Sequence, residues 1–322
     1  MNKRGLLLIL GWVLSAQLCF AQHNDTIVFN NQTIISNTTD SSTLFKKRLS
    51  LVTKLQTLGY GGSLLALNQA WYANYPRSSF HFYNDGGEWL KMDKVGHAYT
   101  AYLLSRIGHT SWQWAGASPK KAILYASLTG IGYQTIIETL DGFSSQWGWS
   151  WNDMAANTLG TGIWASQQWA WGTQKIRLKF SAHYNKYTDP QLEARTNQYF
   201  GSFLPERLLK DYNAQTYWLS ANVHSFLPQT PAPKWLNIAI GYGAENMFGG
   251  YKNSWTTSTA FIDRPDIKRY PQWYLSLDVD FEKIPTKNKA VKSLLFVLNA
   301  IKFPAPTLLL SNGKISSQWL YY

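Results

Sequence analysis

The chain has 322 residues, a formal net charge of +12 and one cysteine. A single cysteine excludes an intrachain disulfide and any cluster of thiolate metal ligands. Charged residues make up only 15% of the chain and aromatic residues 16%, including 16 tryptophans. Soluble domains carry about 25% charged residues, and Trp and Tyr favour membrane–water interfaces. The composition therefore favours a membrane-associated protein, with an aromatic-rich soluble core as the alternative.

Residues 1–21 resemble a secretory signal peptide. A basic start at Lys3 and Arg4 precedes an apolar run over 6–14 and a small-residue exit that ends in Ala21. This pattern is too short for a lasting membrane span and predicts export. An exported chain does not meet nucleic acid, so the positive charge indicates attraction to anionic membrane lipid instead.

The next segments predict a polar lead-in and a first helix. Residues 22–44 are rich in Asn, Thr and Ser and predict an extended lead-in with little that could build a core. Over 45–75, leucine and valine recur at helical spacing, and Pro76 ends the pattern. We expect His81, in the aromatic connection that follows, to be a packed histidine and not a metal ligand.

Three further helices are expected in the central part. The first begins at Asp93, which suits a helix start, and ends near Gly108. The second begins at Pro119, a favoured first-turn residue, and ends at 141–142. The third follows Ser150, which resembles the start of a capping box, and runs to about residue 171. Short connections make successive helices antiparallel, so one end of the bundle holds two helix starts and one helix finish.

This topology brings polar side chains together. Residues three or four apart on a helix share a face. The resulting candidate polar cluster comprises Asp93, His97, Glu138, Asp141, Asp153 and Asn157.

Several interpretations of the polar cluster remain open. It could be a buried staple between helices, since buried charges are tolerated when they are paired. It could be a non-catalytic binding pocket. As a chemical site, His97, Glu138 and Asp153 could bind Zn²⁺ or Mn²⁺, or Glu138 could act as a general base with a raised pKa. The expectation is a cluster with no cofactor, no resident metal and no assigned catalytic residue.

After residue 171 the pattern changes to strands. The sequence predicts a basic strand-like segment, one short helix, three strands, an apolar helix and a terminal hairpin, at 175–180, 205–212, 216–223, 235–242, 273–281, 293–301 and 307–322. The predicted fold is mainly α with a smaller β part: an antiparallel helical bundle over about 45–171, then short antiparallel strands and a C-terminal hairpin. The predicted units are 1–21, 22–44, 45–180 and 181–322, the last packed on the helical unit.

Several segments carry a family resemblance. DKVGHAYTAY, ETLDGFSSQWGWSWNDMAANTLGT, KDYNAQTYWLS, WLNIAIGYGAENM and the IKFPAP-to-WLYY ending resemble an uncharacterised family of predicted periplasmic (lipo)proteins, the YfiM-like group in its long Bacteroidetes-type form. The helical unit is more distantly similar to VanZ-like membrane proteins, which pair a DKxxH opening with a D-x-x-x-N-x-x-G ending, here Asp153, Asn157 and Gly160. The resemblance implies location and architecture but no reaction.

The functional expectation is a non-enzymatic, membrane-associated envelope protein, a subunit or scaffold at the periplasmic face of the outer membrane. Its expected partners are membrane lipid and outer-membrane protein machinery. The alternative is a lipid- or glycan-modifying envelope enzyme that uses the cluster of Asp93, His97, Glu138 and Asp153.

The first testable prediction concerns processing. A lipid-attachment signal requires a small residue before the cysteine, whereas Leu18 precedes Cys19. Signal peptidase should therefore cleave after Ala21 and leave Gln22 as the first residue, without a lipid anchor. Intact-mass measurement of the mature protein checks this, and a diacylated Cys19 at its start would contradict it.

Overall fold

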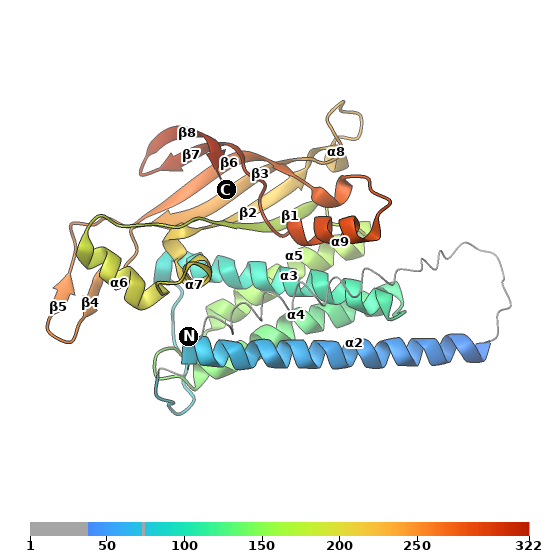
Figure 1. The fold of residues 1–322 in the computed structure, drawn as a ribbon, viewed down its shortest axis with the longest axis horizontal. Coiled ribbons are helices and arrows are strands. Elements are labelled where there is room, and N and C mark those ends of the chain that lie inside the picture. The colour runs from blue at the N-terminus through green and yellow to red at the C-terminus, as the bar shows by residue number, and fades with distance from the viewer. Residues whose placement is uncertain (1–37, 73–74, 322) are drawn as a thin grey trace.

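The computed structural model describes residues 38–72 and 75–321, and shows a helical unit beside a curled antiparallel sheet (Figure 1). The signal peptide predicted over 1–21 lies outside the described residues, as does most of the predicted lead-in. Helix α2 (Thr38–Leu67) is followed by a π-helical turn (Asn68–Tyr72). The lead-in prediction is therefore wrong for its last residues, because α2 begins at Thr38 and not near residue 45.

The predicted antiparallel bundle is confirmed. It consists of α3 (Met92–Trp114), α4 (Pro119–Gly142) and α5 (Trp151–Trp171), and α3 packs against both α4 and α5. Helix α3 extends about two turns beyond its predicted end near Gly108. Gly108 lies inside the helix and packs against Ala126 and Thr129 of α4. Ser150 caps α5 as predicted, because its Oγ accepts the backbone N–H of Asp153 at 3.1 Å.

Small residues bring the helix backbones close together. A Cβ at Gly160 of α5 would collide with the backbone of Ala98 on α3. Ala98 and Gly160 therefore form a backbone-to-backbone contact that a larger residue at either site would separate. The same face of α5 carries Asp153 and Asn157, about two turns and one turn before Gly160.

The β part is a six-stranded antiparallel sheet in the order β1-β2-β3-β6-β7-β8. Its strands are β1 (Ile176–Ala182), β2 (Gln215–Asn222), β3 (Leu236–Glu245), β6 (Tyr270–Val279), β7 (Ala305–Ser311) and β8 (Lys314–Tyr321). The predicted hairpin is confirmed as β7–β8, turned by Asn312 and Gly313 with φ of 48° and 73°. The predicted unit boundary at residue 180 falls within β1, and β1 pairs with β2 of the sheet. The boundary therefore lies before β1.

Shorter elements lie between the long helices and the strands. They are α6 (Pro190–Phe200), α7 (Leu204–Lys210), α8 (Val223–Phe226), α9 (Lys289–Leu298), the 3-10 turns η2 (Glu88–Lys91), η3 (Tyr212–Ala214) and η4 (Phe281–Lys283), and a small hairpin of β4 (Ser254–Thr256) and β5 (Phe261–Asp263). The predicted short helix corresponds to α7 and the predicted apolar helix to α9. The polar helix α6 was not among the predicted elements; its start signals are Asp189, whose side chain caps it, and Pro190.

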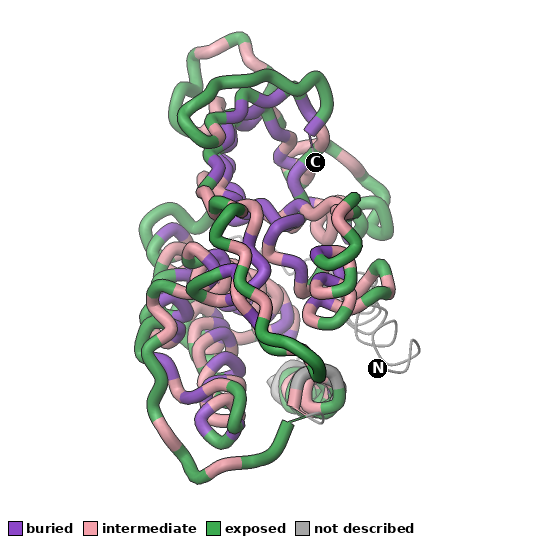
Figure 2. Tube along the Cα trace, turned by 90° about the vertical axis from the view of Figure 1, so that its left-hand side faces the viewer, coloured by how far each residue is buried: buried purple, intermediate pink, exposed green. Residues whose placement is uncertain are grey.

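Charged side chains join the sheet to the bundle. Arg177 of β1 pairs with Asp280 at 3.1 Å and with Glu282 at 2.6 Å, and Glu282 also pairs with Arg106 of α3 at 3.1 Å. Buried residues therefore run continuously through both parts of the molecule (Figure 2). Of the helices in the described part of the chain, none is both long and apolar enough to cross a membrane.

A prediction follows from the contact between α3 and α5. Gly160→Ala should lower the free energy of unfolding by about 1–3 kcal/mol, since the new methyl group meets backbone that cannot move aside cheaply. Chemical denaturation in detergent micelles measures the change.

Gly162→Ala is the matched control, two residues away on the same helix. A Cβ there meets none of the described atoms within 4 Å, so the substitution should be neutral or stabilise by about 0.5–1 kcal/mol. Equal stability of the two variants would show that α3 and α5 are not in backbone contact.

Candidate functional site

The bundle end beside the sheet holds the candidate polar cluster. Asp93 and His97 come from the first turns of α3, Glu138 from the last turn of α4, and Asp153 and Asn157 from the start of α5. Glu138, Asp153 and Asn157 are buried. The convergence expected from the order of helix starts and finishes is therefore present in the structure.

Lys94 lies at the centre of the carboxylates. Its Nζ is 2.7 Å from Asp85 Oδ2, 2.8 Å from Asp93 Oδ2 and 2.7 Å from Asp153 Oδ1. Although burial disfavours the ammonium, the charges of Asp93 and Asp153 raise the pKa of Lys94 well above its ordinary value. Lys94 therefore stays charged and offsets part of the repulsion among the three aspartates.

His97 lies between the three helices. Its Nδ1 is 3.6 Å from Glu138 Oε1 and its Nε2 is 3.7 Å from Asp153 Oδ1, so the carboxylates are within ion-pair distance but beyond a hydrogen bond. When protonated, Nδ1 donates to Asn157 Oδ1 at 3.2 Å. Asn157 Oδ1 also accepts from Gln134 Nε2 at 2.8 Å, which fixes the amide beside the ring.

Glu138 has a strongly raised pKa. Burial, followed by the negative charges of Asp153 and Asp141, raises the pKa of Glu138 to about 9, against a backbone N–H bond from Ser150 that lowers it. Glu138 is fully buried, and its Oε1 has no hydrogen-bond partner among the described residues. At neutral pH this carboxyl group is therefore a neutral acid beside an imidazole.

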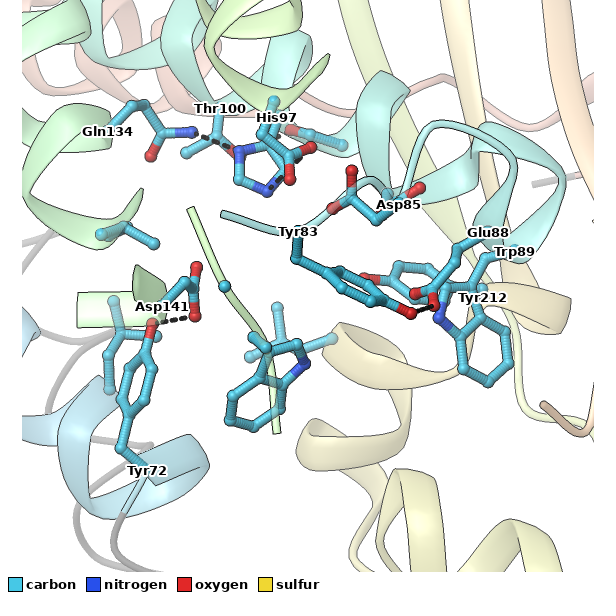
Figure 3. Close-up of a pocket in the computed structure, with 18 of the residues that line it drawn as sticks. Tyr72, Tyr83, Asp85, Glu88, Trp89, His97, Thr100, Gln134, Asp141 and Tyr212 are labelled. Carbon is cyan, nitrogen blue, oxygen red and sulfur yellow. Dashed lines mark hydrogen bonds and ion pairs between the residues drawn. The ribbon is translucent and has the colours of Figure 1, made fainter. Parts of the chain in front are cut away.

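Asp141 lies apart from the other acids, toward α2. Its Oδ1 accepts the hydroxyl of Tyr72 at 2.7 Å, as Figure 3 shows. Burial raises the pKa of Asp141 to about 6, although the Tyr72 bond lowers it. Burial also raises the pKa of Asp93 to about 6, although Lys94 opposes the shift. Both acids therefore titrate closer to neutrality than an exposed aspartate.

A cavity of about 350 Å³ opens beside these groups. Its polar wall includes His97, Gln134, Asp141 and Asp153, and Figure 3 shows the labelled side chains around it. Its other walls are largely aromatic and come from segments far apart in the sequence, namely Tyr72, Tyr83, Trp89, Trp147, Tyr212 and Tyr217. A mainly apolar pocket with a few convergent polar groups is the usual form of a small-molecule site.

A strained turn positions the start of α3. Trp89, Leu90 and Lys91 have φ of 50°, 49° and 66°, three consecutive non-glycine residues in the left-handed region. Such a conformation costs of order 1–3 kcal/mol per residue and persists only where surrounding contacts hold it. Trp89 N–H donates to Gly250 O at 2.8 Å, and Leu90 O accepts the Tyr242 hydroxyl at 2.6 Å. The sheet side of the molecule therefore holds the turn that aims Asp93, Lys94 and His97.

Two groups of ligand atoms have a spacing compatible with a metal ion. They are His97, Glu138 and Asp153, and Asp85, Asp93 and Asp153, with atoms within 4.8 Å of one another. In the second group the Lys94 ammonium already supplies the positive charge. The first group shares Asp153 with Lys94, so a cation there would compete with the ammonium for the same oxygen.

Sequence reasoning missed several residues of the site. Lys94 was not assigned to the cluster, although its position beside Asp93 in the DKVGH segment was a usable signal. Asp85 lies in a loop and reaches Lys94 because that loop folds back onto α5, where Ser150 Oγ donates to Asp85 Oδ1. Gln134 had no pattern that distinguished it from other helix residues. The aromatic wall needs the tertiary structure.

Comparison with known proteins gives one match. Residues 81–166 match the model of a family described as predicted periplasmic lipoprotein (DUF2279). No curated protein and no solved structure matches the chain. The matched segment contains Asp85, Lys94, His97, Glu138 and Asp153, whereas Tyr72 and the sheet lie outside it. The match supports an uncharacterised periplasmic family and an exported location; the YfiM-like and VanZ-like resemblances stay predictions.

The state of Glu138 yields a prediction. Between its ordinary pKa of 4.5 and the folded value of about 9, the folded protein keeps a proton that the unfolded chain has lost. Folding therefore loses stability as pH rises through this window, and Glu138→Gln should remove that part of the slope. Glu138→Ala should cost about 1–3 kcal/mol more than the Gln variant, because it leaves the Ser150 N–H unpaired.

Denaturant unfolding in micelles at about pH 5 and about pH 9 measures these slopes. Glu206→Gln, a glutamate of α7 outside the cluster, is the control and should leave the pH dependence unchanged. Parallel profiles for the wild type and Glu138→Gln would mean that Glu138 is ionised in the folded state.

Proposed function

We propose that this protein is a non-enzymatic, membrane-associated component of the cell envelope, located at the periplasmic face of the outer membrane, that holds a polar ligand group in its cavity. The predicted signal peptide and the family match support the location. The cavity and its polar wall support the binding role.

The single observation that carries the binding role is the incomplete pairing of a buried cluster. A staple between helices should satisfy its own polar atoms, since an unpaired buried group costs about 1–3 kcal/mol. Among the described residues, Asp93 Oδ1, Gln134 Oε1, Glu138 Oε1 and Asn157 Nδ2 are buried without a hydrogen-bond partner. Two of these atoms, Asp93 Oδ1 and Gln134 Oε1, belong to residues that line the cavity. Acceptors at the cavity wall are suited to a ligand with hydroxyl or amine groups.

The chemistry of the walls indicates the kind of ligand. Aromatic rings such as Tyr83 and Tyr212 present flat apolar surfaces, and the carboxyl and amide groups accept hydrogen bonds. A sugar or polyol headgroup presents hydroxyl groups on its edges and C–H groups on its faces. An envelope lipid headgroup or glycan unit therefore fits the cavity better than an inorganic anion, which the acidic side chains would repel.

A second candidate function is acid–base catalysis on such a ligand. The observation in its favour is the raised pKa of Glu138, only 3.6 Å from the imidazole of His97. A neutral acid beside an imidazole that lines the cavity can take part in proton transfer to and from a ligand. Glu138 would then be the proton donor and His97 the acceptor.

The prediction is that His97→Ala keeps the protein folded and at wild-type level but loses its bound molecule. Native mass spectrometry of protein extracted in detergent from its own membranes should show a bound mass for the wild type that the variant lacks. His81→Ala is the control, because His81 does not line the cavity. If the His97→Ala protein does not accumulate, the cluster is a structural staple between the helices and not a binding site.

The same measurement separates binding from catalysis. Incubated with envelope lipids or glycan fragments, a binding protein leaves their masses unchanged. An enzyme converts them, and Glu138→Gln should then retain the bound substrate without converting it.

A further inference from the structure

The two faces of the sheet have the opposite polarity from that of a sheet in water. The inner face, which the curled sheet encloses, is buried and largely polar. Around an apolar cluster of Trp218, Tyr274, Leu309 and Tyr321 it carries Lys179, Ser181, Thr216, Ser220, Asn237, Gln272, Ser276, Asp278 and Thr307. These groups are paired with one another. Lys179 Nζ lies 2.8 Å from Asp278 Oδ2, and the hydroxyl of Tyr321 joins Thr216 to Tyr274 through contacts of 2.9 Å.

The opposite face is apolar and exposed. We define the outer face as Leu219, Ile238, Ile240, Trp273, Leu275, Leu277, Leu308 and Leu310, whose exposed fractions lie between 44% and 56%. The strand register places Ile240, Leu275 and Leu308 side by side across β3, β6 and β7. An antiparallel sheet that faces water normally turns its polar side outward. A continuous apolar surface of this kind marks an interaction site.

The helices cover only one edge of this surface. Leu178 of β1 packs with Trp164 and Tyr102 of the bundle, and Tyr217 of β2 packs with Tyr99. Beyond them an apolar groove of about 470 Å³ separates α5 from the sheet, with Leu159 and Ile163 on one side and the outer face on the other. The apolar surface therefore continues from the sheet onto α5, where Leu159 is 61% exposed.

We infer that the outer face lies among the acyl chains of an anionic phospholipid leaflet. This rests on the membrane association in the proposed function and names the surface responsible for it. The outward positions over 236–242, 271–279 and 306–310 are aliphatic, aromatic or proline. A typical protein–protein interface contains about one hydrogen bond per 100–200 Å². The side chains of the outer face do not offer hydrogen bonds at this density. Lipid requires none, because β3, β6 and β7 each pair on both sides.

Charge at one end of the sheet complements anionic headgroups. The strand pairing puts Lys234, before β3, beside the end of β6, and the chain continues from there through Lys287 to α9. Exposed lysines at this end, near α8 and α9 in Figure 1, are Lys234, Lys287, Lys289 and Lys292. The acids there are already engaged: Asp278 with Lys179, and Asp280 with Arg177. Exposed Trp235 and Phe303 accompany the lysines, an aromatic and basic rim typical of a membrane interface.

The test compares vesicle binding of matched leucine variants. Leu275→Asn/Leu308→Asn changes cross-strand neighbours on the outer face, exposed 47% and 50%. Leu44→Asn/Leu51→Asn changes leucines of similar exposure, 47% and 45%, on α2, away from the cavity. Full-length mature protein, diluted from detergent onto vesicles of phosphatidylethanolamine and phosphatidylglycerol, is separated by flotation. We expect the outer-face variant to partition at least about tenfold less and the α2 variant to match the wild type.

Two further arms separate apolar insertion from charge. Wild-type binding should persist at about 1 M salt, where the Debye length is about 3 Å. Lys289→Glu/Lys292→Glu should weaken binding to anionic vesicles and not to neutral phosphatidylcholine vesicles. Complete release by salt, or equal partitioning of the two leucine variants, would overturn the inference.

Self-association is the competing occupant, and it has its own readout. If the outer-face variant abolishes a wild-type dimer in detergent while vesicle binding is unchanged, the outer face is an interface between copies and not a lipid surface. The ligand bound in the cavity is measured separately in detergent. Failure of vesicle binding with ligand retained would therefore refute this inference alone, and loss of ligand with vesicle binding intact would refute the cavity proposal alone.

Discussion

The contact between the backbones of Ala98 and Gly160 determines the geometry of the site. It fixes the rotation of α5 about its axis, so that Asp153 and Asn157, on the same face as Gly160, point at α3. His97 precedes Ala98 and therefore meets these two side chains. Because a methyl group would separate the helices, the distance between the imidazole and the carboxylates depends on a residue that carries no functional group.

Much of the bundle could be predicted from local signals. Pro119 and Ser150 mark helix starts because their side chains suit a first turn or satisfy a free N–H group. Helix starts and short connections were enough to place Asp93, Glu138 and Asp153 at one end. Lys94 could not be assigned in this way, since a lysine in the first turn of a helix is usually solvated. Its partner Asp85 comes from a loop whose path depends on tertiary contacts.

The sheet shows where periodicity stops being informative. The alternation in YLSLDVDF puts Leu275 and Leu277 on one face, but a period of two does not say which face is buried. In water the apolar side would be inside. Here Asp278 is buried beside Lys179, and the leucines are outside. The sequence pattern is the same in both cases, so only the three-dimensional structure shows which face is buried.

The left-handed turn at Trp89, Leu90 and Lys91 limits the modularity of the protein. The family-matched segment contains the polar side chains of the site, yet the backbone that aims them is held by Gly250 and Tyr242, far outside that segment. Trp89 is likewise enclosed by Phe200 and Tyr212. An excised helical unit would relax this turn to an ordinary conformation and redirect the start of α3. The helical unit and the sheet thus form one structural unit. Grafting the bundle onto another scaffold would transfer the residues of the site without their geometry.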